Sequence, residues 1–339
     1  MMKTTKRALP RRNDAMPDAA GKAPTTQRIE RSPGLARSMG KDYGGTMSDQ
    51  WIDLTAERQR FLINGTDRVR YLNGQITNDV RKCTPTRALA GCLCNAKGRI
   101  EAEMVVTRDA SDHTLLVDGP VALGGDLLAR LEKYLVSDDV EITDITHQSR
   151  LWHVPGPLPV GIPPTAARES RRLGIPGHDI WERDGDAAIA PGGAMAPAER
   201  QRLRLLHGVP AWGAELLPGE VFPAEAGMDT WAVDFHKGCY VGQEVVSRIQ
   251  SAGKVNRRLC LLQGTGSPPA AGTSLCLPDG KEPLAAITSV AEDGTGWLAL
   301  AFLPRVLAVP ETRLVIAGES DSLIYDLEVR NFLPSGSPG

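Results

Sequence analysis

The segment from Lys237 to Glu244 carries the residues whose types and spacing most clearly suggest chemistry. It reads KGCYVGQE and leads into a helical pattern with apolar positions at 245, 246 and 249. Gly238 and Gly242 permit unusual backbone angles or the close approach of a ligand. Cys239 stands just before the helix and two residues after Lys237, and both features favour a thiolate. The segment predicts a reactive thiol or, alternatively, a small buried cysteine in a tight turn.

The chain has six cysteines, at positions 83, 92, 94, 239, 260 and 276, without a CxxC pair or an HExxH motif. Cys92 and Cys94 share one face of a predicted strand, and Cys83 could add a third thiolate ligand. A structural metal site usually needs four ligands, and no fourth is suggested nearby. We therefore predict no metal site. Reduced thiols and the lack of an apolar signal segment favour a cytosolic type of compartment.

The net charge of −2 hides an asymmetry along the chain. Residues 1–41 carry 10 basic and 3 acidic residues, or +7, which leaves 29 basic and 38 acidic residues, or −9, for the remainder. An acidic body argues against a broad nucleic-acid-binding face. No apolar run approaches the ~18 residues of a membrane-spanning helix. We expect a monomer with no nucleic-acid or membrane partner. Residues 1–47 lack an apolar period, which predicts a disordered extension, and Met47 is an alternative start.

Helical and strand patterns alternate over the first two thirds of the chain. They predict helices over 66–74, 125–136 and 197–207, a hairpin of strands 88–94 and 99–107, and a strand at 115–117. In the second strand of the hairpin, positions 100, 102, 104 and 106 share one face, and we assign Glu101 and Glu103 to a solvent-exposed face. Short apolar runs at 259–262, 284–290, 297–302 and 323–329 predict a small all-β barrel.

Together these residues resemble the tetrahydrofolate-binding YgfZ family, relatives of the glycine-cleavage aminomethyltransferase. KGCYVGQE is the signature of that family, and here it includes Tyr240, Gln243 and Glu244. Four further segments agree with family motifs in order and spacing: Gln75-Ile76-Thr77-Asn78-Asp79, Lys97-Gly98-Arg99, Arg204 with Gly208-Val209-Pro210, and Phe222-Pro223-Ala224-Glu225. The resemblance covers about residues 50–335.

The resemblance implies an α+β fold of three domains around a central channel, with two ferredoxin-like α+β modules and a C-terminal small β-barrel. After the extension at 1–47, we expect an N-terminal folate-binding module at 48–150. A second module at 151–252 would carry the signature, and the barrel would occupy 253–335. Tetrahydrofolate would bind in the channel.

The chemistry of folate indicates which residues would bind it. Its pterin needs a carboxylate or backbone groups for its donor edge, and its anionic glutamyl tail needs Arg or Lys. The candidates are Glu225 for the pterin and Arg204, Lys237 and Arg248 for the tail, and the resemblance adds Gln75, Asn78 and Asp79. Each is alternatively an ordinary surface or ion-pair residue.

The resemblance implies a factor that supports iron–sulfur cluster assembly or repair and thereby tRNA methylthiolation, with iron–sulfur enzymes as clients. Its location would be the bacterial cytoplasm, or the mitochondrial matrix in a eukaryote. Whether the chain is itself an enzyme stays open.

One alternative function is a folate-dependent aminomethyltransferase. The transferases carry a G-G-x-x-D-D hairpin with an acid for transfer, whereas this chain has Glu101 followed by Ala102. They also lack a cysteine at the position of Cys239. Both departures favour the YgfZ branch. A third hypothesis is a thiol-redox protein that uses Cys239.

Overall fold

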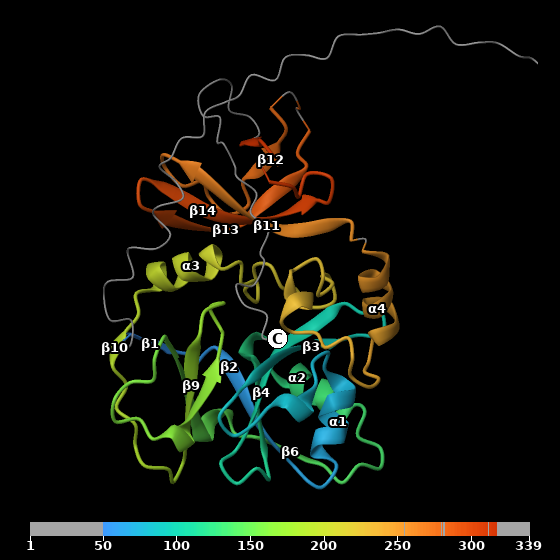
Figure 1. Ribbon diagram of the computed structural model, residues 1–339, viewed down its shortest axis with the longest axis vertical. Helices are drawn as coiled ribbons and strands as arrows, with labels where there is room; N and C mark the ends of the chain where they lie inside the picture. The colour runs from blue at the N-terminus through green and yellow to red at the C-terminus, as the bar shows by residue number, and fades with distance from the viewer. Residues whose placement is uncertain (1–49, 254, 279, 281, 311, 317–339) are drawn as a thin grey trace, which may run out of the picture. The chain divides into compact units, whose positions relative to one another are not determined.

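Three five-stranded sheets form the framework of the protein (Figure 1). The computed structural model describes residues 50–253, 255–278, 280, 282–310 and 312–316. The extension predicted at 1–47 and the strand predicted at 323–329 lie outside the described residues. The mixed α+β class predicted from the sequence is confirmed. The three-domain arrangement, its boundaries and the central channel stay predictions.

The first sheet has the strand order β3-β4-β5-β2-β6. Its strands are β2 (Arg58–Asn64), β3 (Leu89–Cys94), β4 (Ile100–Arg108), β5 (Leu115–Pro120) and β6 (Glu141–Asp144). The predicted hairpin is confirmed, because β3 and β4 pair antiparallel across the turn at residues 95–98. Alternation along β4 is confirmed as well, since all four predicted inward side chains are buried: Ile100, Ala102, Met104 and Val106.

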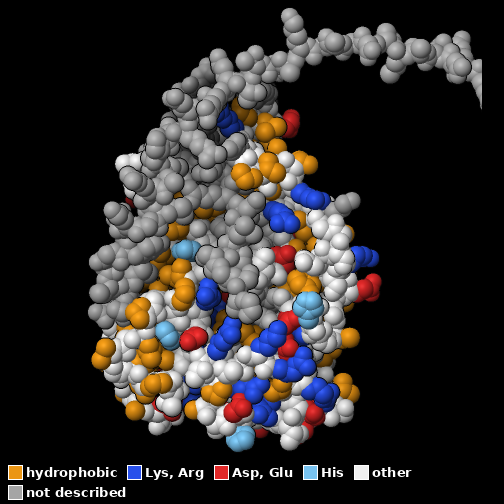
Figure 2. Space-filling view, viewed as in Figure 1, with side chains coloured by type: hydrophobic (Ala, Val, Ile, Leu, Met, Phe, Trp, Pro, Cys, Tyr) orange, Lys and Arg blue, Asp and Glu red, His pale blue; other side chains and the backbone are white. Residues whose placement is uncertain are grey.

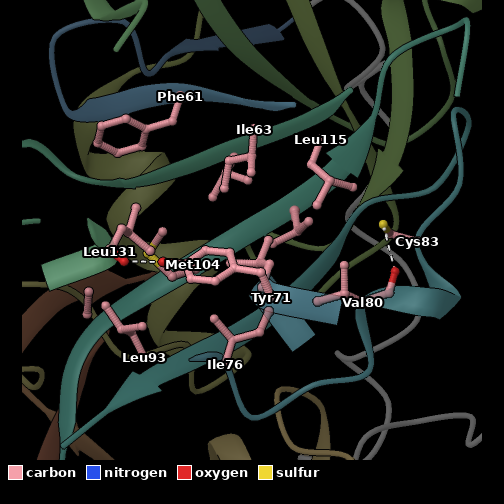
Figure 3. Close-up of a cluster of buried hydrophobic side chains, with 14 of the residues drawn as sticks. Phe61, Ile63, Tyr71, Ile76, Val80, Cys83, Leu93, Met104, Leu115 and Leu131 are labelled. Atoms are coloured by element: carbon pink, nitrogen blue, oxygen red, sulfur yellow. Dashed lines mark hydrogen bonds between the residues drawn. The ribbon is translucent and has the colours of Figure 1, made fainter. Parts of the chain in front are cut away.

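Two helices, α1 (Arg68–Gln75) and α2 (Gly125–Glu132), contribute to the core of this first sheet. Figure 3 shows Tyr71 of α1 lying among Met104, Leu93 and Ile76, with its hydroxyl donating to the carbonyl of Leu131. The helix predicted from residue 125 begins there and ends four residues earlier than expected, at Glu132. A buried Tyr hydroxyl needs a partner, and this bond joins α1 to the end of α2.

The second sheet has the order β10-β1-β7-β9-β8. Its strands are β1 (Gln50–Asp53), β7 (Ser149–Pro155), β8 (Ala167–Ser170), β9 (Gly177–Arg183) and β10 (Gly193–Ala194). β1 pairs antiparallel with β7 and parallel with β10, so the chain enters this sheet before it builds the first one. Residues 50–53 thus join a sheet whose other strands come from 149–194.

A buried network of charges connects the first two sheets. Arg172 donates to Asp118 of β5 at 2.6 and 3.0 Å and to Asp179 of β9 at 2.8 and 2.9 Å. Arg58 of β2 donates to the same Asp118 at 2.6 Å. Burial alone would raise the pKa of Asp179, but Arg172 and His153 hold it far below its ordinary value. Such a network resists the loss of any member, because the partner charge would stay buried and unpaired.

The third sheet has the order β11-β14-β13-β12-β15. Its strands are β11 (Arg257–Thr265), β12 (Ser274–Cys276), β13 (Ala285–Asp293), β14 (Gly296–Pro304) and β15 (Val315–Ile316). The helix α3 (Pro197–Leu206) ends one residue before its predicted end and packs on β13 and β14 (Figure 1). Leu205 joins leucines of β11 and β14 in one buried cluster. Closure of this sheet into a barrel stays a prediction.

The remaining described helices are short or lie near the signature segment. They are α4 (Gln243–Ala252) and the 3-10 turns Val80–Lys82, Val121–Leu123, Thr146–Gln148, Pro164–Ala166 and Met228–Thr230. None of the helices in the described part of the chain has the length and apolar character needed to cross a membrane. Figure 2 shows Lys and Arg gathered with Asp and Glu on the lower half of one face, so both signs of charge are mixed there.

The buried network predicts a specific dependence of stability on pH. Nδ1 of the fully buried His153 lies 2.9 Å from Asp179 Oδ1, while its Nε2 has no hydrogen-bond partner among the described residues. Burial therefore lowers the pKa of His153 below its ordinary 6.5. Because the unfolded chain then binds the proton more tightly, the free energy of unfolding falls as the pH drops below 6.5.

We expect His153→Gln to flatten this fall below pH 6.5, because each unit of pKa depression contributes about 1.4 kcal/mol to the free energy of unfolding. Urea unfolding at several pH values measures the slope. His207, whose pKa burial also lowers, is present in both proteins and cancels in the comparison. Identical slopes for the variant and the parent would contradict a depressed His153.

Candidate functional site

The ammonium of Lys237 is buried within the signature loop and donates only to backbone. It lies 2.7 Å from the carbonyl oxygen of Ile76 and 2.8 Å from that of Asn78, and it also bonds the carbonyl of Asn73. An ammonium has three hydrogens, so these bonds use all of them. Burial lowers the pKa of Lys237 to about 8, against the opposing charges of Asp79 and Asp234.

The end of α1 explains why a lysine suits this position. The last carbonyl groups of a helix lack partners within the helix, and a cation nearby satisfies them and interacts favourably with the helix dipole. The signature loop adds backbone bonds to the same region, from Val241 N to Gly74 O at 3.2 Å and from Asp234 N to Thr77 O at 3.0 Å. Two segments about 160 residues apart in sequence, bonded through Lys237 at separations of 159 to 164, therefore form one unit.

Thr77 is a residue of this unit to which the sequence analysis gave no role. Its side chain is fully buried. Its hydroxyl donates to Ala232 O at 2.6 Å and accepts from Cys92 N at 2.8 Å. The hydroxyl thus connects β3 to the segment before the signature. Its position within the Gln75–Asp79 motif is the sequence feature that could have identified Thr77 as part of the site.

A close contact between two glycines holds the turn at residues 95–98 against the signature loop. Gly242, the residue before α4, has φ of 85°, and a Cβ on it would lie 2.4 Å from the carbonyl oxygen of Asn95. Gly98 has φ of 74°, and a Cβ there would lie 3.0 Å from Cβ of Val245. Both positions need glycine, for the left-handed backbone and for the approach. Three of the predicted motif segments therefore meet at this site.

Cys239 is exposed, and the other five cysteines are buried. This exposure contradicts the alternative of a small buried cysteine. The contribution expected from Lys237 to the thiolate gains no support, because the ammonium is engaged by the carbonyls of Asn73, Ile76 and Asn78. What the geometry provides is an accessible thiol on a loop that is anchored on both sides.

Cys92 and Cys94 lie buried in β3, within an apolar cluster. Burial raises the pKa of Cys94 to about 12 and also raises that of Cys92, so both stay protonated at neutral pH. Cys83 belongs to a different cluster. Among the described residues, no group of three or more His, Cys, Asp or Glu could hold a metal ion.

The expected folate ligands of the Gln75–Asp79 segment all have protein partners. The side-chain oxygen of Gln75 accepts from Arg130 at 3.2 Å, and the amide of Asn78 donates to Ala90 O at 2.7 Å. Asp79 accepts from the guanidinium of Arg81 at 2.7 and 2.8 Å. The hydrogen bond from Arg81 lowers the pKa of Asp79.

Arg204 joins several elements through its hydrogen bonds, and its predicted role in binding a folate tail stays a prediction. Its five N–H groups donate to Val209 O at 2.8 Å, Glu215 at 2.9 Å, Ser289 at 2.7 Å, and Gln201 at 3.1 and 3.2 Å. These bonds join α3 to the following loop and to β13. Glu215, which the sequence analysis missed, is the buried counter-ion.

The remaining two candidates lie elsewhere on the described structure. Glu225 accepts from Phe222 N at 3.2 Å and lies 3.5 Å from Nε of Arg257. Arg248 is exposed on α4. In the described part of the chain, no hydrogen bond or ion pair joins either side chain to the Gln75–Asp79 segment.

The two acidic side chains of β4 were expected on a solvent-exposed face, but in the structure each is paired with an arginine. Glu101 is paired with Arg130 at 2.6 Å, and Glu103 is paired with Arg58 at 2.8 Å. Both carboxylates are only partly exposed. Ala102 between them is fully buried, so this stretch of hairpin presents no unpaired acid.

We expect Lys237→Met to reduce the free energy of unfolding by about 2–4 kcal/mol, because it leaves buried carbonyl oxygens without their donor. The control is Lys97→Met, which removes an exposed lysine from the adjacent turn and should change stability by less than about 0.5 kcal/mol. Denaturant unfolding compares the two variants. Equal stability of Lys237→Met and the parent would show that the ammonium does not hold the loop.

Comparison with known proteins adds independent findings. Residues 50–162 match the family model described as GCVT N-terminal domain. A mitochondrial "iron-sulfur cluster assembly factor IBA57 homolog" of Chaetomium globosum is 27% identical over 250 residues, covering 64% of this chain and 57% of the relative. The homologue from Mycosarcoma maydis is 25% identical, covering 68% of this chain and 64% of the relative. The matched region is thus less than two thirds of these relatives.

A bacterial relative and a solved structure agree with these matches. The "tRNA-modifying protein YgfZ" of Klebsiella pneumoniae is 28% identical over 242 residues, covering 64% of this chain and 73% of that protein. The crystal structure of aminomethyltransferase T from Bartonella henselae superposes with a TM-score of 0.69 at 18% identity, covering 85% of this chain and 88% of that one. At that identity the superposition shows the fold alone. The motifs, the family model, the relatives and the fold agree, and together they support placing the chain in the YgfZ/GcvT-like superfamily.

Proposed function

We propose that this chain binds a reduced folate and supports the assembly or repair of iron–sulfur enzymes, and through them tRNA methylthiolation. The observation that carries the proposal is the intact signature loop, which Lys237 ties to the Gln75–Asp79 segment while Cys239 stays exposed. The similarity to an iron–sulfur cluster assembly factor and to a tRNA-modifying protein supports it.

The side chains with unused bonding capacity limit how a folate would bind. Arg204 and Lys237 have no donor left for a glutamyl tail, so Arg248 is the remaining cation among the candidates. The carboxylate of Glu225 could accept from the donor edge of the pterin. Trp231 exposes 40% of its surface, and its carbonyl lies 3.4 Å from the amide of Asn78, so it offers an apolar ring on which a pterin could stack.

Two alternatives are less well supported by the contacts. An aminomethyltransferase would need an acid in the hairpin, but Ala102 is buried, and Glu101 and Glu103 are held by arginines. A thiol-redox protein would need a second cysteine to resolve a disulfide with Cys239, and the other five thiols are buried. We therefore favour an accessory factor over either enzyme.

Tetrahydrofolate should bind the purified full chain with measurable heat and raise its melting temperature. At a ligand concentration of ~100 Kd, binding to the native state stabilises by about 2.7 kcal/mol. Calorimetric titration with tetrahydrofolate, folate and formyltetrahydrofolate measures this. Glu225→Gln should weaken binding, whereas Glu141→Gln, at an exposed position of β6, should not. The folate hypothesis is wrong if saturating tetrahydrofolate gives neither heat of binding nor a rise in melting temperature.

Cys239→Ser should melt like the parent and still bind folate, yet fail to restore iron–sulfur enzyme activity in cells that lack the native gene. Serine is nearly isosteric, and an exposed loop position creates no cavity. Cys94→Ser is the structural control, because it places a hydroxyl in an apolar cluster and should lower stability. Full restoration of activity by Cys239→Ser would show that the thiol is dispensable.

A further inference from the structure

A cavity of about 430 Å³ lies where the first two sheets face each other, away from every residue assigned above to the signature or to folate. The residues that bound it are Thr55 and Ala56 after β1, Arg60 of β2, Val121 after β5, Thr146 and His147 before β7, Ser149 and Arg150 of β7, and Glu182, Arg183 and Asp184 around the end of β9. Its volume falls within the range of about 300–1,000 Å³ typical of small-molecule sites.

Arg60 places a buried positive charge against this cavity. Its side chain is fully buried, and its guanidinium donates to Ser149 Oγ at 2.9 Å and to four backbone carbonyls. All these acceptors are neutral. Arg60 forms no ion pair with a carboxylate in the described part of the chain, and burial lowers its pKa. Its charge is therefore solvated by dipoles but not neutralised.

A second buried arginine neighbours the cavity-lining Arg183. Arg168 of β8 is 4% exposed, its Nε is buried without a partner, and it makes no hydrogen bond or ion pair with any described residue. Burial and the charge of Arg183 together lower the pKa of Arg168 to about 10. The ion pair of Arg183 with Asp186 is long, at 3.6 Å. An unpaired arginine in such a place is costly to stability.

The neighbouring acids compensate these charges only in part, because the pKa of each arginine stays lowered. Glu182 accepts from Ile189 N at 2.6 Å and faces Arg150 at 3.5 Å, while Asp184 is exposed. Asp109, the acid with the largest influence on Arg168, already accepts from Ser111, His113 and Thr114. An incoming anion would supply the missing partner.

We propose that this cavity binds a small molecule through a phosphate or carboxylate group, which Arg183 contacts within the field of Arg60 and of Arg168, the buried arginine beside Arg183. Guanidinium groups match the planar or bidentate geometry of both anions. This anion site is independent of the folate proposal, because phosphate, pyrophosphate and citrate can test it without a folate.

The first test titrates the full chain with sodium phosphate, pyrophosphate and citrate, followed by calorimetry and thermal melting. Sodium chloride at matched ionic strength is the control. Saturable binding of a phosphate alone identifies phosphate chemistry, and saturable binding of citrate alone identifies carboxylate chemistry. Binding of both supports a general anion site. The proposal is overturned if the heat and the melting temperature change only with ionic strength, or if no anion binds saturably.

Three variants connect the binding to these arginines. Arg183→Met should weaken anion binding by about tenfold or more. Arg168→Met should do the same and also raise the melting temperature of the anion-free protein, since it removes an unpaired buried charge. Arg171→Met, at an exposed arginine of the same region, should change neither the anion affinity nor the melting temperature. Anion affinity unchanged in both Arg183→Met and Arg168→Met would overturn the proposal, as would a lower melting temperature for Arg168→Met.

Discussion

The ammonium of Lys237, buried against carbonyl oxygens at the end of α1, is the interaction on which the candidate site depends. A compact charge with three hydrogens can satisfy three acceptors at once, and here they come from Asn73, Ile76 and Asn78. Because Ile76 and Asn78 belong to one motif and the lysine to another, these bonds fix the register between the two motifs. The contact of Gly98 with Gly242 then adds the hairpin turn, since backbone at that separation leaves no room for a side chain.

A second constraint orients the two sheets on which this assembly is built. Arg172 and Arg58 converge on the fully buried Asp118, and Arg172 also reaches Asp179 in the second sheet. Apolar side chains from both sheets, among them Leu116, Leu151 and Trp181, pack in the same interface. The paired arginines and the unpaired Arg60 and Arg168 therefore differ in kind. The first group closes a network, whereas the second leaves buried charge that costs stability, which is the pattern expected where function opposes stability.

Periodicity predicted the local elements, because each depends on residues close in sequence. The alternation of β4, the hairpin and the starts of α2 and α3 followed from side-chain spacing. The pairing of β1 with β7 could not be predicted this way, since it joins residues about 100 positions apart without a local signal. The role of Arg204 could not be predicted either. The sequence alone does not distinguish an arginine that hydrogen-bonds Glu215 and Ser289 from an arginine that is free to bind a ligand. A motif therefore indicates the family of a chain without showing which of its side chains remain available to bind a ligand.

That distinction bears on how the signature works. Gln75, Asn78, Asp79, Lys237 and Arg204 all have hydrogen-bond partners within the protein, which suits them to position other groups. Cys239 and Arg248 are exposed and have no such partners among the described residues. A reactive group is placed more accurately by a loop that is bonded on both sides than by a mobile one. The buried lysine and the two glycines supply that rigidity, and the exposed thiol is the group that they position. The polar residues of the motif thus hold the loop in place, and the side chains that they leave unbonded are the ones available to a ligand.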